Sequence, residues 1–296
     1  MRALIIGTGY VGLPLAVELV RRGHEVSGLR RDGSRAHVLA AAGITPIIAD
    51  ITRPDELKRL PNDFDWVVNC VASNGGGVED YRKVYLEGIR NVIDWLKPAG
   101  ANGPGPRLVY TSSTSVYGQN DGSLVDETSF TEPVTETGQA LLQTERTLLN
   151  AAQVRNFAAM VMRVAGIYGP ERGYWLRQFL NGEASIDGDG TRFLNMIHRD
   201  DVIGCVIAAL EHGAAGEIYN AVDDEPVSQL DFISWLAASL RKPMPQAAAD
   251  NFETARKRGV TNKRISNSKL KTRLGYSFKY PTFREGYAER ILELLK

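Results

Sequence analysis

Three glycines near the start of the chain have the spacing of a phosphate-binding turn. The pattern G-x-G-x-x-G occupies Gly7, Thr8, Gly9, Tyr10, Val11 and Gly12. The first glycine permits a tight turn, the second lets backbone approach phosphates, and the third lets a helix pack closely on a strand. The N-terminus of the following helix offers free N–H groups to an anion. We therefore expect a bound dinucleotide pyrophosphate, with a ligand-free glycine-rich turn as the alternative.

The charged residues after the second predicted strand indicate which dinucleotide binds. A carboxylate about 20 residues past the glycines holds the ribose hydroxyls of NAD, whereas an arginine suits the 2′-phosphate of NADP. Arg30 and Arg31 stand at that place. Paired guanidinium N–H bonds grip a phosphate dianion and gain little from a neutral ribose. We therefore expect NADP(H) to be preferred over NAD(H), with a solvated arginine pair as the alternative.

The elements that must position these residues alternate along the first half of the chain. We predict strands at 2–6, 24–29, 46–49, 65–71, 107–112 and 158–164 and helices at 11–22, 33–42, 80–97 and 134–152. The later strands are continuous apolar runs, which are typical of a parallel sheet covered on both faces. The pattern predicts an α/β fold with a doubly wound parallel sheet, a Rossmann fold.

After residue 170 the alternation loosens, and only a helix at 201–210 and a strand at 217–220 are clear. We predict an NADP-binding Rossmann domain of residues 1–168, to which 195–222 return. A smaller interleaved α/β lobe, from 169–194 and 223–296, would bind substrate. Ligands of such sheets lie beyond the carboxyl ends of the strands. We expect the reaction where the lobe closes over 70–73, 111–117 and 164–168.

The amino-acid composition indicates which classes of binding partner to expect. The 296 residues are 43% hydrophobic and 24% charged, and 35 basic residues balance 35 acidic ones. Without a basic surplus, we expect neither a nucleic-acid nor a membrane partner, but a small-molecule substrate. Cys70 and Cys205 stand in apolar contexts and predict buried thiols in a reducing compartment, so we expect a cytoplasmic protein. No His or Cys pair has metal-ligand spacing, and we expect no metal.

Further motifs follow the glycine turn in order. They are Asp50-Ile51, T-S-S-T-S-V-Y-G at 111–118, Arg163 with I-Y-G-P at 167–170, I-H-R-D-D-V at 197–202 and Y-P-T-F-R-E-G at 280–286. Over nearly the whole chain this set resembles the extended short-chain dehydrogenase/reductase family, the NAD(P)-dependent epimerase/dehydratase group. The resemblance implies pairing of two copies as a homodimer, through helices 80–97 and 134–152. Beyond the turn and the arginines, we expect cofactor contacts at Asp50, Ile51, Cys70, Val71, Ala72 and Val164.

The resemblance also implies a catalytic serine at Ser113 and, on the next helix, a tyrosine followed four residues later by a lysine. Counting from Ser113 and anchoring on Glu145 places that pair at Thr137 and Leu141. A threonine hydroxyl is far too weakly acidic to replace a phenol, and leucine supplies no cation to lower its pKa. The sequence thus resembles an atypical subgroup without the Tyr/Lys pair.

Three residues are therefore the candidates for catalysis. We expect Ser113 and Tyr117 to hold the reacting oxygen, and water or Tyr85 to supply the proton. The structural alternatives are a serine that satisfies a turn, a half-buried tyrosine wall and an aromatic core residue. His198 precedes two acids, but we expect it to belong to the cap of the following helix and not to act as a general base.

Together these observations predict an NADP(H)-dependent oxidoreductase, or an epimerase/dehydratase relative, acting on a small polar carbonyl or hydroxyl compound. The alternative is a catalytically weak or inactive NADPH-binding sensor or scaffold of the same fold. Loss of the Tyr/Lys pair favours this alternative, whereas Ser113 and a full second lobe oppose it.

Overall fold

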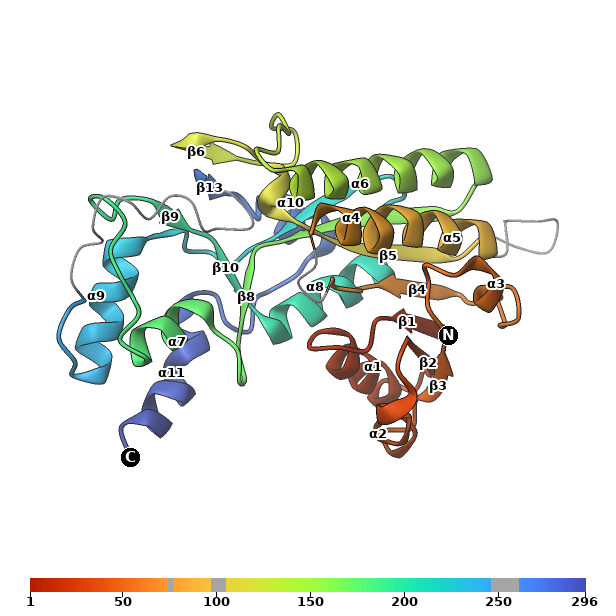
Figure 1. The fold of residues 1–296 in the computed structure, drawn as a ribbon, viewed down its shortest axis with the longest axis horizontal. Coiled ribbons are helices and arrows are strands. Elements are labelled where there is room, and N and C mark those ends of the chain that lie inside the picture. The colour runs from red at the N-terminus through yellow and green to blue at the C-terminus, as the bar shows by residue number, and fades with distance from the viewer. Residues whose placement is uncertain (74–76, 97–104, 246–260) are drawn as a thin grey trace.

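A seven-stranded parallel sheet forms the centre of the molecule (Figure 1). The structure, a computed structural model, describes residues 1–73, 77–96, 105–245 and 261–296. The strand order is β11-β7-β5-β4-β1-β2-β3, so the winding reverses between β1 and β4. This confirms the predicted Rossmann-like class. The strands are β1 (Arg2–Ile6), β2 (Glu25–Arg30), β3 (Thr45–Ile48), β4 (Trp66–Asn69), β5 (Arg107–Ser113), β7 (Ala158–Val164) and β11 (Ile218–Ala221).

Helices cover both faces of the sheet. On one face, apolar side chains of α1 (Gly12–Arg21), α2 (Ala36–Ala41) and α8 (Arg199–His212) share a core with the strands. On the other face, α3 (Pro54–Leu57), α5 (Gly88–Trp95) and α6 (Glu136–Arg155) do the same. Burial on both faces explains why the strands are continuously apolar.

The predicted strands are all present, with ends shifted by at most a few residues. The helix predicted at 33–42 is interrupted. It begins as a 3₁₀ turn, η1 (Gly33–Arg35), because the Asp32 carboxylate accepts a hydrogen bond from the Ser34 backbone N–H. The helix predicted at 80–97 starts earlier, with α4 (Val78–Tyr81), and runs through a π-helical segment, η2 (Arg82–Glu87), into α5; residue 97 lies outside the described residues.

A second group of elements has its own apolar core. It contains α7 (Tyr174–Leu180), α9 (Gln229–Leu240) and α11 (Phe283–Leu294), together with the short strands β9 (Phe193–Leu194), β10 (Met196–His198) and β12 (Val227–Ser228). β10 pairs with β8 (Gly166–Tyr168) and β12 with β9. By contrast, α10 (Ser268–Leu274) contributes its buried leucines to the core beside α8.

One strand pair brings distant parts of the chain together outside the central sheet. β6 (Asn120–Val125) pairs in parallel with β13 (Asn262–Ile265), as Figure 1 shows. The sequence did not predict β6. Among the described residues, no helix has the length and apolarity that a bilayer crossing requires.

Candidate functional site

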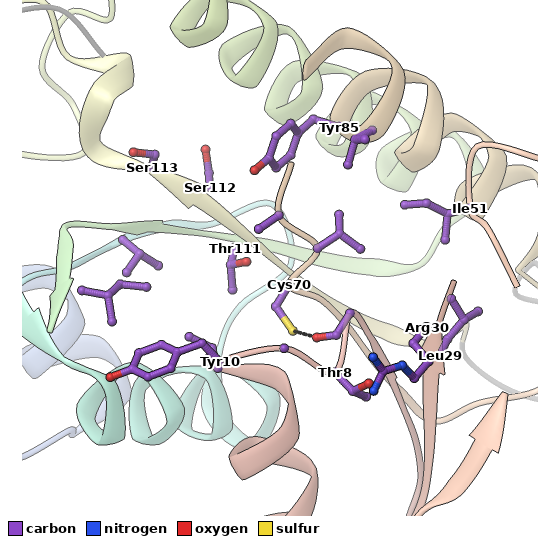
Figure 2. A pocket seen from close by; sticks show the side chains of 18 of the residues that line it. Thr8, Tyr10, Leu29, Arg30, Ile51, Cys70, Tyr85, Thr111, Ser112 and Ser113 are labelled. Atoms are coloured by element: carbon purple, nitrogen blue, oxygen red, sulfur yellow. Dashed lines mark hydrogen bonds between the residues drawn. The ribbon is translucent and has the colours of Figure 1, made fainter. Parts of the chain in front are cut away.

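A cavity of about 440 Å³ lies at the carboxyl ends of the strands, where the winding reverses. Figure 2 shows the glycine turn below it and the end of β5 with η2 above. Of the residues predicted for the site, only Gly12 and Tyr117 do not line it. Those that do are Gly7, Thr8, Gly9, Tyr10, Val11, Arg30, Arg31, Asp50, Ile51, Cys70, Val71, Ala72, Tyr85, Ser113 and Val164.

The glycine turn is packed where the sequence requires it and open where a ligand would approach. Gly7 has φ +93°, and a Cβ there would come within 2.8 Å of the Val71 backbone nitrogen. A Cβ at Gly12 would come within 2.0 Å of the Gly7 carbonyl oxygen. A Cβ at Gly9 meets nothing within 4 Å. Gly7 and Gly12 therefore serve packing, and Gly9 leaves space beside the cavity.

Cys70 ties β4 to the turn. Its thiol donates a hydrogen bond of 3.3 Å to the Gly7 carbonyl, drawn as the dashed line in Figure 2. Burial raises the pKa of the Cys70 thiol to about 12. Because only a thiolate is a good nucleophile, this side chain supports the turn and does not react. Both cysteines are free thiols.

At the far end of the cavity, two buried polar atoms lack partners among the described residues. They are the Nε of Arg30 and the hydroxyl oxygen of Thr8. The Thr8 methyl group lies over Gly28, two residues before Arg30 on the same face of β2. Asp32, the next carboxylate, does not line the cavity and accepts a 2.8 Å bond from the Ser34 backbone N–H. This end of the cavity thus presents donors and no carboxylate from the loop after β2.

Ser113 ends β5 at the other end. Its Oγ accepts a 3.2 Å hydrogen bond from the Ser115 N–H and thereby caps a 3₁₀ turn, η3 (Thr114–Val116). Ser113 therefore satisfies a turn, which is the structural alternative given above. Its side chain also lines the cavity. Tyr85 projects from η2 into the cavity, on the side of Ser113 (Figure 2). Its hydroxyl oxygen accepts a 3.2 Å bond from the Ser73 N–H. π-Helical turns occur often at functional sites because they reorient side chains.

The structure places Tyr117 away from the cavity. It is fully buried, and its hydroxyl donates to Asn220 at 2.9 Å and accepts from Arg163 at 2.8 Å. Arg163 pairs with Glu145 at 2.8 Å, and Ser112 also donates to Glu145. Burial raises the pKa of the Tyr117 phenol. We therefore correct the expectation that Tyr117 contacts substrate, because its hydroxyl is used inside this network.

His198 caps α8, as expected from the sequence. Its Nδ1 accepts a 3.2 Å hydrogen bond from the Asp200 N–H. Burial lowers the pKa of His198 to about 4, which keeps the imidazole neutral and able to accept. Asp201 accepts from Tyr276 and from two backbone N–H groups. These groups hold elements together and do not line the cavity.

Comparison with known proteins places the chain in a family. The NAD dependent epimerase/dehydratase family matches residues 3–221. The chain belongs to this family. Enzymes of this epimerase/dehydratase family act on small molecules and have an NAD(P)-binding fold, which agrees with the cavity.

Individual relatives and solved structures are only distantly similar to this chain. Protein YeeZ of Escherichia coli K12 is 28% identical over 95% of this chain and 96% of its own length. The solved structure of a putative NAD-dependent epimerase/dehydratase from Methylobacillus flagellatus is 30% identical, with a TM-score of 0.77 over 100% of this chain and 99% of that one. A UDP-glucuronic acid 4-epimerase from Bacillus cereus in complex with NAD shares the fold at 23% identity, with a TM-score of 0.79 and full coverage of both chains (100%).

Sequence reasoning missed one cation of this family member's cavity, Arg172. Its guanidinium lies 5.0 Å from the centre of the Tyr10 ring, and that of Arg199 lies 5.3 Å from it. The Tyr10 hydroxyl donates to the Pro170 carbonyl at 3.0 Å, joining the glycine turn to the I-Y-G-P loop. Reciprocal backbone bonds with Gly169 fix Arg172 there. A basic residue two positions after Pro170 was the available signal.

Proposed function

We propose that the protein is an NADP(H)-dependent oxidoreductase of the epimerase/dehydratase family, acting on a small carbonyl or hydroxyl compound. One observation carries the proposal. A single cavity runs from Arg30 and Arg31, past the glycine turn, to Ser113. A phosphate-binding end and a hydroxyl-bearing end in one cavity match the two halves that a redox dinucleotide and its substrate need.

The preference for NADP(H) rests on the end of the cavity at Arg30. The pyrophosphate would lie against Gly9 and the N-terminus of α1. A 2′-phosphate oxygen would accept from Arg30 and Thr8, whose buried polar atoms lack partners among the described residues. Leaving such groups unsatisfied costs free energy, which an anion at this place would recover.

The reacting oxygen would lie at Ser113. The cofactor would supply a hydride to the carbonyl carbon. The Ser113 hydroxyl would donate a hydrogen bond to the carbonyl oxygen, and Tyr85 or a water molecule would transfer the proton that this oxygen gains. Leu141 lines the cavity from α6, so that helix offers no cation at this position to favour the phenolate. General acid catalysis from Tyr85 would contribute about 10²-fold or more in rate.

The cofactor is tested by titrating the protein with NADPH and NADH and following fluorescence. We expect tighter NADPH binding. Arg30→Asp should weaken NADPH binding by about tenfold or more, since one charged hydrogen bond is lost and a like charge is added. Arg59→Asp, in the exposed turn that follows α3, is the matched control and should leave binding unchanged. Tighter binding of NADH to the native protein would overturn the proposed preference.

Turnover is tested with a panel of aldehydes and ketones, following NADPH oxidation. Ser113→Ala should lower kcat by about tenfold or more, and Tyr85→Phe by about 10²-fold or more if the phenol is the proton donor. NADPH binding should persist in both variants. Native protein that binds NADPH but turns over no compound would support the sensor or scaffold alternative. That alternative shares the binding end of the cavity.

Two further proposals concern the cellular location and the oligomeric state of the protein. We keep the proposal of a cytoplasmic protein, supported by two free thiols. We also keep the proposal of a homodimer formed through α5 and α6. Sedimentation at micromolar concentration tests the dimer, and a single species of 32.5 kDa would contradict it.

A further inference from the structure

A second cavity, of about 300 Å³, opens beside the first and shares Ser113, Ala165 and Ile167 with it. A ligand in it would therefore reach the proposed reacting end. Its wall combines aromatic and apolar side chains with polar ones, among them Ser113, Asn195 and Lys263. The aromatic residues are Tyr168, Tyr174, Trp175, Phe193 and Tyr287.

Lys263, on β13, is the buried cation of this second cavity. It is 4% exposed. Its Nζ donates to the Tyr117 carbonyl at 2.9 Å and to the Thr261 hydroxyl at 2.7 Å. An ammonium group has three N–H bonds, so one is left after these two. Of the residues that the structure describes, none brings a carboxylate within ion-pair distance of Lys263.

A buried ammonium without a counter-charge is unfavourable, because its lost hydration is not replaced by an opposite charge. The effect is visible in the pKa of Lys263, which desolvation lowers to about 8. At neutral pH the side chain still carries its proton for most of the time. If Lys263 only joined Tyr117 to Thr261, neutral donors would suffice. The positive charge indicates an anion that is not part of the described chain.

The local charge points to a monoanion. Arg192 is the other cation lining this cavity within the described residues, and it pairs with Asp187 at 3.0 Å. Lys263 therefore supplies one charge and one remaining N–H bond. The single charge of a carboxylate balances the charge of Lys263, whereas a phosphoryl dianion would leave a second negative charge without a counter-charge in the cavity.

We infer that the second cavity receives a carboxylate on an apolar, ring-sized body, with Lys263 binding the carboxylate and the aromatic wall contacting the body. This inference rests on the proposed function for the identity of the reacting end. It narrows the substrate class to carbonyl or hydroxyl acids. Lys263 thereby becomes a specificity-determining residue, placed beside the cavity by the pairing of β13 with β6.

The test compares three probes of similar size, using calorimetry at pH 7 on the full chain with NADPH present. The probes are 3-phenylpropanoate, its neutral amide 3-phenylpropanamide and phenyl phosphate. The native protein should bind the acid about tenfold more tightly than the amide, as one charge-assisted bond predicts. In Lys263→Met this preference should be lost, so that the acid and the amide bind about equally tightly. Lys58→Met, the same change at an exposed lysine of the surface, should leave it intact.

Three outcomes overturn the inference. They are equal binding of acid and amide by the native protein, a preference that survives in Lys263→Met, and tighter binding of phenyl phosphate than of the acid. If Lys263→Met does not fold, the ranking of the probes by the native protein decides the question alone. NADPH affinity is measured separately, so failure of this inference is distinct from failure of the proposed cofactor.

Discussion

Two sets of polar side chains with buried atoms lie in and around the cavities, and they differ in how their interactions are completed. In the first set, Ser112, Glu145, Arg163, Tyr117 and Asn220 satisfy one another. In the second set, which lines the cavities, Arg30 and Thr8 have polar atoms without described partners, and Lys263 has no described counter-charge. A completed network explains stability, whereas an incomplete one indicates where a ligand binds.

The largest expected effect breaks the completed network. Arg163→Met leaves Glu145 buried without its partner, so the free energy of unfolding should fall by about 3–5 kcal/mol. Arg290→Met removes an exposed pair with Glu293 and should change it by less than about 1 kcal/mol. Urea denaturation followed by circular dichroism measures both. Equal losses in the two variants would contradict the distinction between the network and surface pairs.

Lowering the pH tests a second group whose hydrogen bonds are completed within the protein, the His198 side chain that caps α8. An unfolded histidine takes up its proton near pH 6.5, but the folded group does so only near pH 4. Between these values the unfolded state binds more protons, so stability should fall as the pH drops from 6.5 to 4. The His198 contribution to this loss should be about 3 kcal/mol, and most of it should appear below pH 6.5.

His198→Asn keeps a side-chain acceptor for the cap but does not titrate. The difference in unfolding free energy between native protein and variant should therefore change across this window. Carboxylates titrate in both proteins and cancel in the difference. A difference that stays constant from pH 7 to pH 4 would show that burial does not hold His198 neutral.

The glycine turn separates packing from ligand access. Gly12→Ala should lower the free energy of unfolding by about 2 kcal/mol, since its Cβ would overlap the Gly7 carbonyl. Gly9→Ala should change stability by less than about 0.5 kcal/mol, because its Cβ meets open space, yet weaken NADPH binding. Thermal unfolding and NADPH titration measure the two effects. Unchanged NADPH affinity in Gly9→Ala would place the pyrophosphate elsewhere.

The smallest expected changes in the free energy of unfolding have opposite signs in the two sets of side chains. Thr8→Val removes a buried hydroxyl that has no described partner, so it should raise the free energy of unfolding without ligand by about 1 kcal/mol, while weakening NADPH binding. Tyr117→Phe removes a hydroxyl with two partners and should lower the free energy of unfolding by about 1 kcal/mol. Denaturation without ligand measures both. The same sign in both variants would contradict the comparison.

Local patterns were enough to predict the sheet and the glycine turn that lines the first cavity. The period of apolar residues indicates buried strands, and Gly7 to Gly12 fix the turn through backbone sterics that are local to the motif. Capping residues also act locally, which explains why α6 starts after Thr135 and ends before Asn156, whose φ is +54°. These features depend on neighbours in the sequence.

Features that depend on distant neighbours were not predicted. β6 is a polar stretch, and it forms a strand because β13, about 140 residues later, pairs with it. The burial of Lys263 follows from that pairing, and no local pattern in the sequence indicates it. Tyr117 shares a motif with Ser113, but the partners Arg163 and Asn220 that draw its hydroxyl inward come from β7 and β11.

The pairing of β6 with β13 also limits how such a protein can be recombined. A late segment of the chain braces the loop that follows Ser113, so the C-terminal third is not a detachable module. A chimera that takes this third from a relative would exchange the support of the proposed reacting end together with the walls of the second cavity. Substrate choice and the alignment of the reacting group would then change together.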